Sequence, residues 1–225
     1  MFFTLKTWQN RLKDKKDLIV QASVTDGSDS WTSWPIGMGF GYVNVKHLET
    51  QIGGRGLLVL CALNADTDQR RRPETPNRKS FLKTLNENGI PNKSLDSKEY
   101  FLQLPNYKFV VSPEGNGMDC HRHYEALVAG CIPIMEDSLL ARQKYGRLPV
   151  LWTQDYSEIT SEYLETVYEK MQGQVYDFST LFLSSYSRPV RREIQENSDF
   201  WMLRLTGNRW YNNRMYIQNG RFHFI

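Results

Sequence analysis

Apolar runs and amphipathic stretches alternate through the middle of the chain. Runs rich in β-branched and aromatic residues predict buried strands, and apolar residues three or four positions apart predict helices. The predicted strands are GLLVLCAL (56–63), YKFVV (107–111), CIPIM (131–135) and LPVLW (148–152). The predicted helices cover 81–89, 97–104, a stretch that begins after Gly117, 138–145 and 161–172. Such alternation predicts an α/β fold with a parallel sheet flanked by helices.

Capping residues give the predicted boundaries of these helices. Ser80 stands directly before an apolar helical pattern and is predicted to cap its start, and Gly89 is predicted to end that helix. Thr160 or Ser161 is predicted to cap the amphipathic stretch SEYLETVYEKMQ.

The two ends of the chain follow a less regular pattern. Residues 1–16 predict an amphipathic helix, DLIVQASV (17–24) a strand, and TDGSDS a turn. A packed irregular segment with three glycines and a short helix at 45–51 are expected next, and the part from Tyr176 on is expected to be helical. We therefore divide the chain into a short N-terminal region (1–54), a Rossmann-like domain (55–194) and a C-terminal helical segment (195–225) that packs back on the N-terminal region.

Composition adds limits on the class of protein. The 225 residues carry a net charge of +3, with 40% hydrophobic and 24% charged residues, which is typical of an ordinary globular protein. This charge is too small for a dedicated nucleic-acid binder, so nucleic acid is not an expected partner. Cys61, Cys120 and Cys131 lack metal-type spacing, and no apolar run reaches the roughly 20 residues of a membrane span. A cytoplasmic protein with reduced thiols and no membrane span is expected.

The loop SPEGNG (112–117) follows the predicted strand 107–111. Its two glycines allow backbone amides to approach an anion closely, and the start of the next helix adds a favourable dipole. Arg122 offers a charge-assisted donor, and Glu125 lies three residues later on the same helix face. One of these two side chains can meet a phosphate and the other a sugar hydroxyl. The alternative is a weak surface salt bridge between them.

A basic loop, NADTDQRRRPETPNRK, follows the predicted strand 56–63. The carboxyl ends of parallel strands meet at one edge of a sheet, so Arg70, Arg71 and Arg72 are expected to face the same site as the glycines. Fixed cationic donors of this kind stabilise a departing pyrophosphate without a metal ion. A merely solvated basic loop is the alternative.

Three further groups of residues carry weaker signals. Asp119, His121 and His123 are spaced so that only two of them share a helix face, which disfavours a zinc site, while His121 or His123 can contact a phosphate or sugar. Cys120 near a helix start is a candidate nucleophile, although packing is the better explanation. Asp26 and Asp29 follow the predicted strand 17–24 and are candidates for a general base, although turn formation explains them equally well.

The string KFVVSPEGNGMDCHRHYEALVAGCIPIM resembles the donor-binding motif of exostosin-like glycosyltransferases, including members encoded by large DNA viruses. LLVLCALNADTDQRRRP resembles the strand and basic loop that precede this motif in the family. TDGSDSW, PIGMGFG and VLWTQDYSEIT are weaker matches that follow the family's order.

The resemblance implies a GT-B architecture: two Rossmann-like parallel-sheet halves, here with a reduced N-terminal half on the acceptor side. It also implies metal-independent, inverting transfer of a sugar from a nucleoside diphosphate, with UDP the expected nucleotide and UDP-rhamnose a suggested donor, to a glycan hydroxyl. No cofactor is implied, further domains of the same polypeptide are expected as partners, and a viral member would act in the host cytoplasm. Asp29, then Asp26, would be the catalytic base. The donor-binding residues would be Arg71, Arg72, Ser112, Glu114, Gly115, Asn116, Gly117, His121, Arg122 and Glu125.

Three other functions remain open on the residues alone. The short N-terminal region also suits a non-catalytic nucleotide-sugar-binding module of a larger transferase. A nicotinamide enzyme is disfavoured because SPEGNG lacks the G-x-G-x-x-G order. A nucleic-acid binder would need a stacking motif or a basic stripe, and the sequence has neither.

Overall fold

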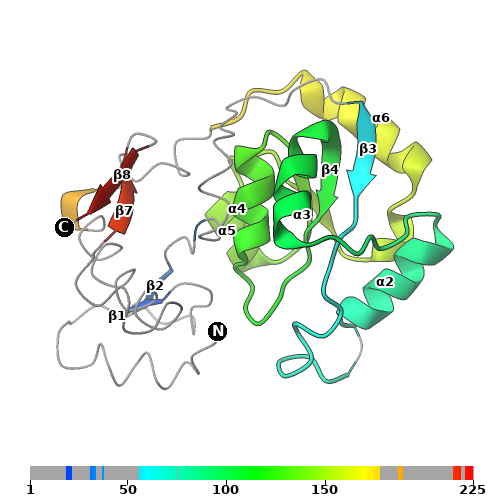
Figure 1. Ribbon diagram of the computed structural model, residues 1–225, viewed down its shortest axis with the longest axis horizontal. Coiled ribbons are helices and arrows are strands. Elements are labelled where there is room, and N and C mark those ends of the chain that lie inside the picture. Colours follow the sequence, from blue (N-terminus) through cyan, green and yellow to red (C-terminus); the bar gives the residue numbers. More distant parts are fainter. Residues whose placement is uncertain are drawn as a thin grey trace. The chain divides into compact units, whose positions relative to one another are not determined.

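The computed structural model (Figure 1) describes residues 56–74 and 76–177 in full. Outside that part it describes four short strands, Gly37 and residues 187–189. The backbone divides into two compact units, Met1–Pro35 with Phe178–Ile225, and Ile36–Asp177. The second unit contains all the residues of the ranges 56–74 and 76–177.

A parallel sheet forms the centre of the Ile36–Asp177 unit. Its strands are β3 (Leu57–Leu60), β4 (Tyr107–Val111), β5 (Ile132–Glu136) and β6 (Leu151–Thr153), and they lie side by side in that order. The predicted α/β fold with a parallel sheet is therefore confirmed. The strand order follows the sequence, so the winding does not reverse within these strands. The crevice of a doubly wound fold, which forms where strand order reverses, is therefore not made by this sheet alone.

The helices follow the predicted order along the chain. They are α2 (Arg78–Glu87), α3 (Ser97–Gln103), α4 (His121–Val128), α5 (Leu139–Tyr145) and α6 (Ser161–Gln172), with 3-10 turns η2 (Leu104–Asn106) and η3 (Tyr156–Glu158). The oxygen of Thr160 accepts from the amide of Tyr163, which confirms the predicted cap of α6. None of the helices in the described part of the chain is long and apolar enough to cross a bilayer.

Two helix starts differ from the prediction. Helix α2 begins a turn earlier, because Asn77 caps it and Ser80 is the third residue of a capping box rather than the cap. Helix α4 begins only at His121, after an irregular stretch that extends past Gly117. Both shifts change which side chains lie in the first turn, and both bear on the site.

Side chains alternate across the sheet and pack on helices at each face. Phe109 and Val111 of β4 join Ile132 and Ile134 of β5 in a core that also includes Tyr168 of α6. Figure 1 shows α6 behind β3, and α3 and α4 in front of β4. Each fully buried large apolar side chain contributes roughly 1.5–3 kcal/mol, so this core supports the edge where the strands end.

One sequence prediction is wrong in the unit made of Met1–Pro35 and Phe178–Ile225. Strands β7 (Met215–Gln218) and β8 (Arg221–Phe224) pair antiparallel, so the predicted helix after Tyr176 is wrong for these two stretches. The sequence between them is Asn-Gly, a strong hairpin signal that the prediction overlooked.

The same unit contains the N-terminal strands. β1 (Ile19–Gln21) confirms part of the strand predicted at 17–24, and it pairs with β2 (Trp31–Ser33) in a segment predicted to be irregular. The predicted helices at 1–16 and 45–51 lie outside the described residues.

Candidate functional site

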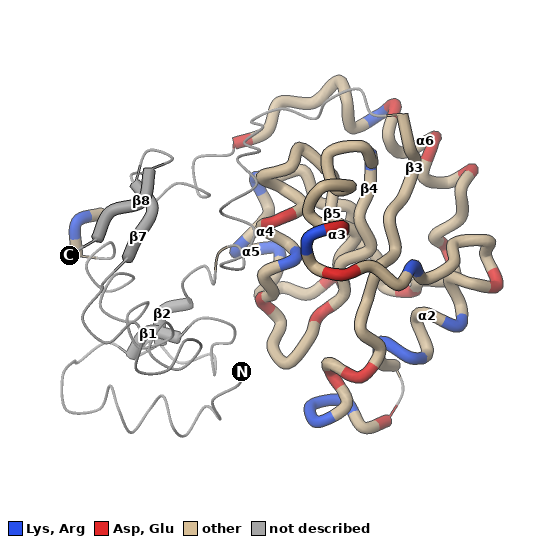
Figure 2. Tube along the Cα trace, viewed as in Figure 1, with Lys and Arg blue, Asp and Glu red and all other residues tan. Residues whose placement is uncertain are grey.

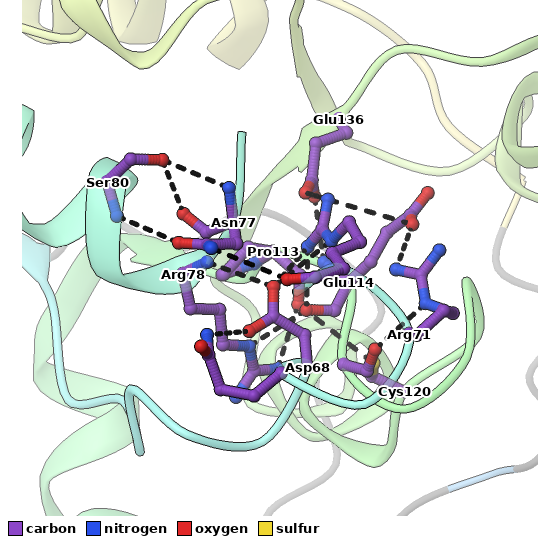
Figure 3. A network of polar contacts seen from close by, with 12 residues as sticks. Asp68, Arg71, Asn77, Arg78, Ser80, Pro113, Glu114, Cys120 and Glu136 are labelled. Atoms are coloured by element: carbon purple, nitrogen blue, oxygen red, sulfur yellow. Dashed lines mark hydrogen bonds and ion pairs between the residues drawn. The ribbon is translucent and has the colours of Figure 1, made fainter. Parts of the chain in front are cut away.

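The candidate site is the glycine loop, residues 112–120, at the carboxyl edge of the sheet. The amide of Ser112 donates to the carbonyl of Ile134 (2.9 Å), so pairing with β5 continues into the start of the loop. The loop after β3 meets it there, and Glu136 ends β5 beside it (Figure 3). The prediction that the basic loop and the glycine loop share one edge is confirmed by their hydrogen bonds.

Arginine side chains hold three successive carbonyls of the glycine loop. Arg78 Nη2 donates to the carbonyl of Pro113 (3.1 Å) and Arg78 Nε to that of Glu114 (2.8 Å). Arg71 Nε donates to the carbonyl of Gly115 (3.2 Å). The arginines therefore hold the loop on the side of its carbonyl groups.

The amides of the loop differ from one another in whether they are hydrogen-bonded. Those of Glu114 and Gly115 are bonded, to Glu136 Oε2 (2.8 Å) and to the carbonyl of Gly117 (2.9 Å). Within the described part of the chain, the amides of Asn116 and Met118 make no hydrogen bond. Unpartnered amides beside a glycine are what an anion-binding loop requires.

The predicted arginine clamp is engaged with carboxylates in this structure. Arg72 Nη1 lies 2.8 Å from Glu136 Oε1 and Arg72 Nη2 2.9 Å from Asp68 Oδ2, while Arg71 pairs with Glu114. Arg70 is exposed. In Figure 2 the loop after β3 carries basic and acidic positions in close succession. Burial, followed by the charge of Glu114, raises the pKa of Glu136.

Arg122 has one donor, Nη1, that lacks a hydrogen-bond partner in the part of the chain that the structure describes. Its guanidinium carbon lies 4.5 Å from the centre of the Tyr100 ring. Arg122 Nη1 and the Tyr100 hydroxyl are both buried without a hydrogen-bond partner among the described residues. Buried donors of this kind are costly unless a ligand or water satisfies them. Glu125, on the same helix, is also buried.

The two histidines support backbone segments. His121 Nδ1 donates to the carbonyl of Gly37 (2.7 Å). His123 is buried between Ser112, whose hydroxyl donates to Nδ1 (2.7 Å), and Met118, whose carbonyl accepts from Nε2 (3.1 Å). Burial lowers the pKa of His123 to about 4, so the ring is neutral and its two nitrogens act as one donor and one acceptor.

Asp119 and Cys120 end the glycine loop. Asp119 is buried and accepts from the hydroxyls of Tyr124 (3.2 Å) and Tyr145 and from Lys144 Nζ (2.6 Å). Burial raises the pKa of Cys120 to about 12, which keeps the thiol protonated and favours its packing role. In the part of the chain that the structure describes, no three His, Cys, Asp or Glu residues are grouped to hold a metal ion.

The structure thus brings together only part of the predicted set. Predicted residues that meet in the loop and its supports are Arg71, Arg72, Ser112, Glu114, Gly115, Asn116 and Gly117. Arg122 and Glu125 lie on α4, and His121 contacts Gly37. Asp26 and Asp29 lie outside the described residues.

Three residues of the network were missed by the sequence prediction: Asp68, Arg78 and Glu136. The Asn77-x-x-Ser80 capping box is the signal that would have found Arg78, because it starts α2 at that residue. No local pattern marks Asp68 or Glu136.

Neither a scan against models of protein families nor a search of curated proteins gives a match to this chain. Its function is therefore argued from its own residues.

Proposed function

We propose that the chain is an exostosin-like glycosyltransferase that moves a sugar from a nucleoside diphosphate, with UDP as the nucleotide and UDP-rhamnose as one donor, to a glycan hydroxyl. The observation that carries the proposal is the glycine loop, whose amides at Asn116 and Met118 have no partner among the described residues. Arg122 Nη1, which is buried and has no partner within the described ranges, supports it.

The proposed roles follow from charge and position. Loop amides and Arg122 hold the pyrophosphate, and Glu125 holds the ribose. Asp29, with Asp26 as second candidate, removes the proton from the acceptor hydroxyl, which attacks the anomeric carbon as the bond to the diphosphate breaks. Donors aimed at the developing negative charge on the leaving group lower the barrier without a metal ion.

Thermal unfolding with UDP, GDP or NAD, each with and without a chelator, tests the nucleotide. Binding to the native state alone raises stability by about 2.7 kcal/mol at a hundred times Kd. We expect UDP to raise Tm, with no effect of the chelator. Stabilisation by NAD instead, or by none of the three, would contradict the proposal.

Arg122→Ala tests the clamp. It is expected to abolish transfer and to remove the Tm shift caused by UDP, because one charge-assisted partner of the pyrophosphate is lost. Lys79→Ala is the control, since Lys79 is exposed and pairs with the exposed Asp66. Transfer at the wild-type rate in Arg122→Ala would refute the role.

A non-catalytic nucleotide-sugar-binding module is the second candidate. The unit Ile36–Asp177 contains every predicted donor-binding residue, whereas the predicted bases Asp26 and Asp29 do not belong to it. Hydrolysis of UDP-sugars separates the two candidates: slow release of UDP by the wild type favours the transferase, and binding without release favours the module. Asp29→Asn should bind UDP normally and lose transfer.

A further inference from the structure

Arg78 is a buried cation whose guanidinium donates to backbone carbonyls and pairs with no carboxylate among the described residues. Its side chain donates to Asn64 (3.3 Å), Pro113 (3.1 Å) and Glu114 (2.8 Å), and the residue is 4% exposed. Its backbone amide, not its guanidinium, bonds to Asp68. A buried charge without a carboxylate partner is unfavourable for stability. The geometry it imposes on the loop is the better reason for its presence.

Arg71 and Arg72 extend the same arrangement. Arg71 Nε reaches the carbonyl of Gly115 (3.2 Å), and Arg72 Nη2 reaches that of Glu114 (3.4 Å). Together the three side chains form what we name the arginine bracket: Arg71, Arg72 and Arg78. The carboxylates of Asp68 and Glu136 hold Arg72 in place.

The arginine bracket determines where the amide of Asn116 points. In a planar trans peptide, the carbonyl of one residue and the N–H of the next point in opposite directions. The Gly115 carbonyl points to Arg71, so the amide of Asn116 points away from the bracket. The Gly117 carbonyl points to the amide of Gly115, so the amide of Met118 also points away from that contact.

Gly115 lies directly against the Arg78 side chain of the arginine bracket. A Cβ at this position would lie 3.1 Å from Arg78 Nη2 and 3.2 Å from Cys120 Sγ. Gly115 does not have a positive φ, so glycine is favoured here by the close approach of Arg78 and Cys120 rather than by a left-handed backbone.

We infer that Arg78 is a positioning residue, and that the arginine bracket turns the carbonyls of residues 113–115 inward so that the amide of Asn116, together with that of Met118, can hold the diphosphate of a nucleotide. This inference rests on the proposed function for its ligand. It gives Arg71 and Arg72 a supporting role in place of direct contact with pyrophosphate. A lysine cannot replace Arg78, because its ammonium lacks the planar fork that spans several carbonyls.

The test compares Arg78→Lys with Lys79→Ala in the full chain. Hydrogen exchange of the 112–120 peptide, without ligand, reports the bracket itself. We expect exchange to be faster by about tenfold in Arg78→Lys and unchanged in Lys79→Ala, because only the first loses loop contacts. Titration with UDP and with inorganic pyrophosphate should show affinity for both reduced about tenfold in Arg78→Lys, at unchanged circular dichroism.

Chemical rescue separates positioning from general stability. Added guanidinium ion at millimolar concentration should restore UDP binding to Arg78→Ala, because it can occupy the vacated site, and it should have no such effect on Lys79→Ala. Gly115→Ala serves as a second variant where Arg78 variants do not fold. Its Cβ displaces Arg78 Nη2, so the same faster exchange and weaker binding are expected.

Wild-type exchange of the 112–120 peptide in folded Arg78→Lys or Gly115→Ala would overturn the inference. If the wild type binds neither UDP nor pyrophosphate, the proposed function fails instead. The exchange result, measured without ligand, still decides whether the bracket shapes the loop.

Discussion

The two ends of the glycine loop are held by different means. At its start, the arginine bracket binds backbone carbonyls and is balanced by the carboxylates of Glu114, Glu136 and Asp68. At its end, one buried carboxylate, Asp119, accepts hydrogen bonds from two tyrosine hydroxyls and from Lys144. The start has several partly exposed charges, whereas the end depends on one buried carboxylate. Removal of one side chain should therefore lower the free energy of unfolding more at the end of the loop than among the partly exposed charges at its start.

Asp119→Ala should have the largest effect on stability. It removes the buried acceptor that the hydroxyls of Tyr124 and Tyr145 and the Lys144 ammonium share, which costs about 3–4 kcal/mol. Urea denaturation measures this loss. Asp66→Ala is the matched control, because its pair with Lys79 (2.9 Å) is exposed and should contribute less than about 1 kcal/mol. Equal losses in the two variants would contradict the difference between buried and exposed pairs.

His123→Gln should change how stability depends on pH. The folded pKa of His123 is lowered by burial from 6.5 to about 4, so the unfolded chain binds the proton more readily. The stability that neutral His123 contributes is complete above pH 6.5 and is lost as pH falls toward 4. The difference corresponds to roughly 3 kcal/mol over that range. Unfolding free energies at several pH values should show a shallower fall in the variant, and parallel curves for variant and wild type would contradict the assignment.

Arg71→Gln should have the smallest effect of the three. Arg71 is exposed, its pair with Glu114 lies at the rim, and glutamine can still donate to the Gly115 carbonyl. We expect a loss of about 0.5–1 kcal/mol that decreases at high salt, because a partly exposed ion pair is screened. A loss as large as that of Asp119→Ala would mean that the two ends of the loop are held equally firmly.

The sequence predicted the elements around the site better than the contacts within it. Strand β4 and helix α6 have the predicted bounds, because alternation and helical spacing are local signals. The start of α2 was placed a turn late, since Ser80 suits a cap as well as Asn77 does when only the chain order is known. Because of that shift, the sequence prediction did not place Arg78 at the start of α2. The sequence prediction of a helix after Tyr176 is wrong for the hairpin β7–β8, whose local signal is the Asn-Gly pair between the strands.

At the candidate site, too, the sequence predicted the local elements but not the contacts between them. The sequence alone identified the glycine loop and its place after a buried strand, because glycines, apolar runs and their order are properties of the chain. It could not assign partners to Arg71 and Arg72, whose contacts with Glu114 and Glu136 join residues from separate loops. Only the tertiary structure brought these loops to one edge of the sheet. There, distance and burial decided that arginines hold the loop by its carbonyls, while the amides of Asn116 and Met118 are left without partners among the described residues.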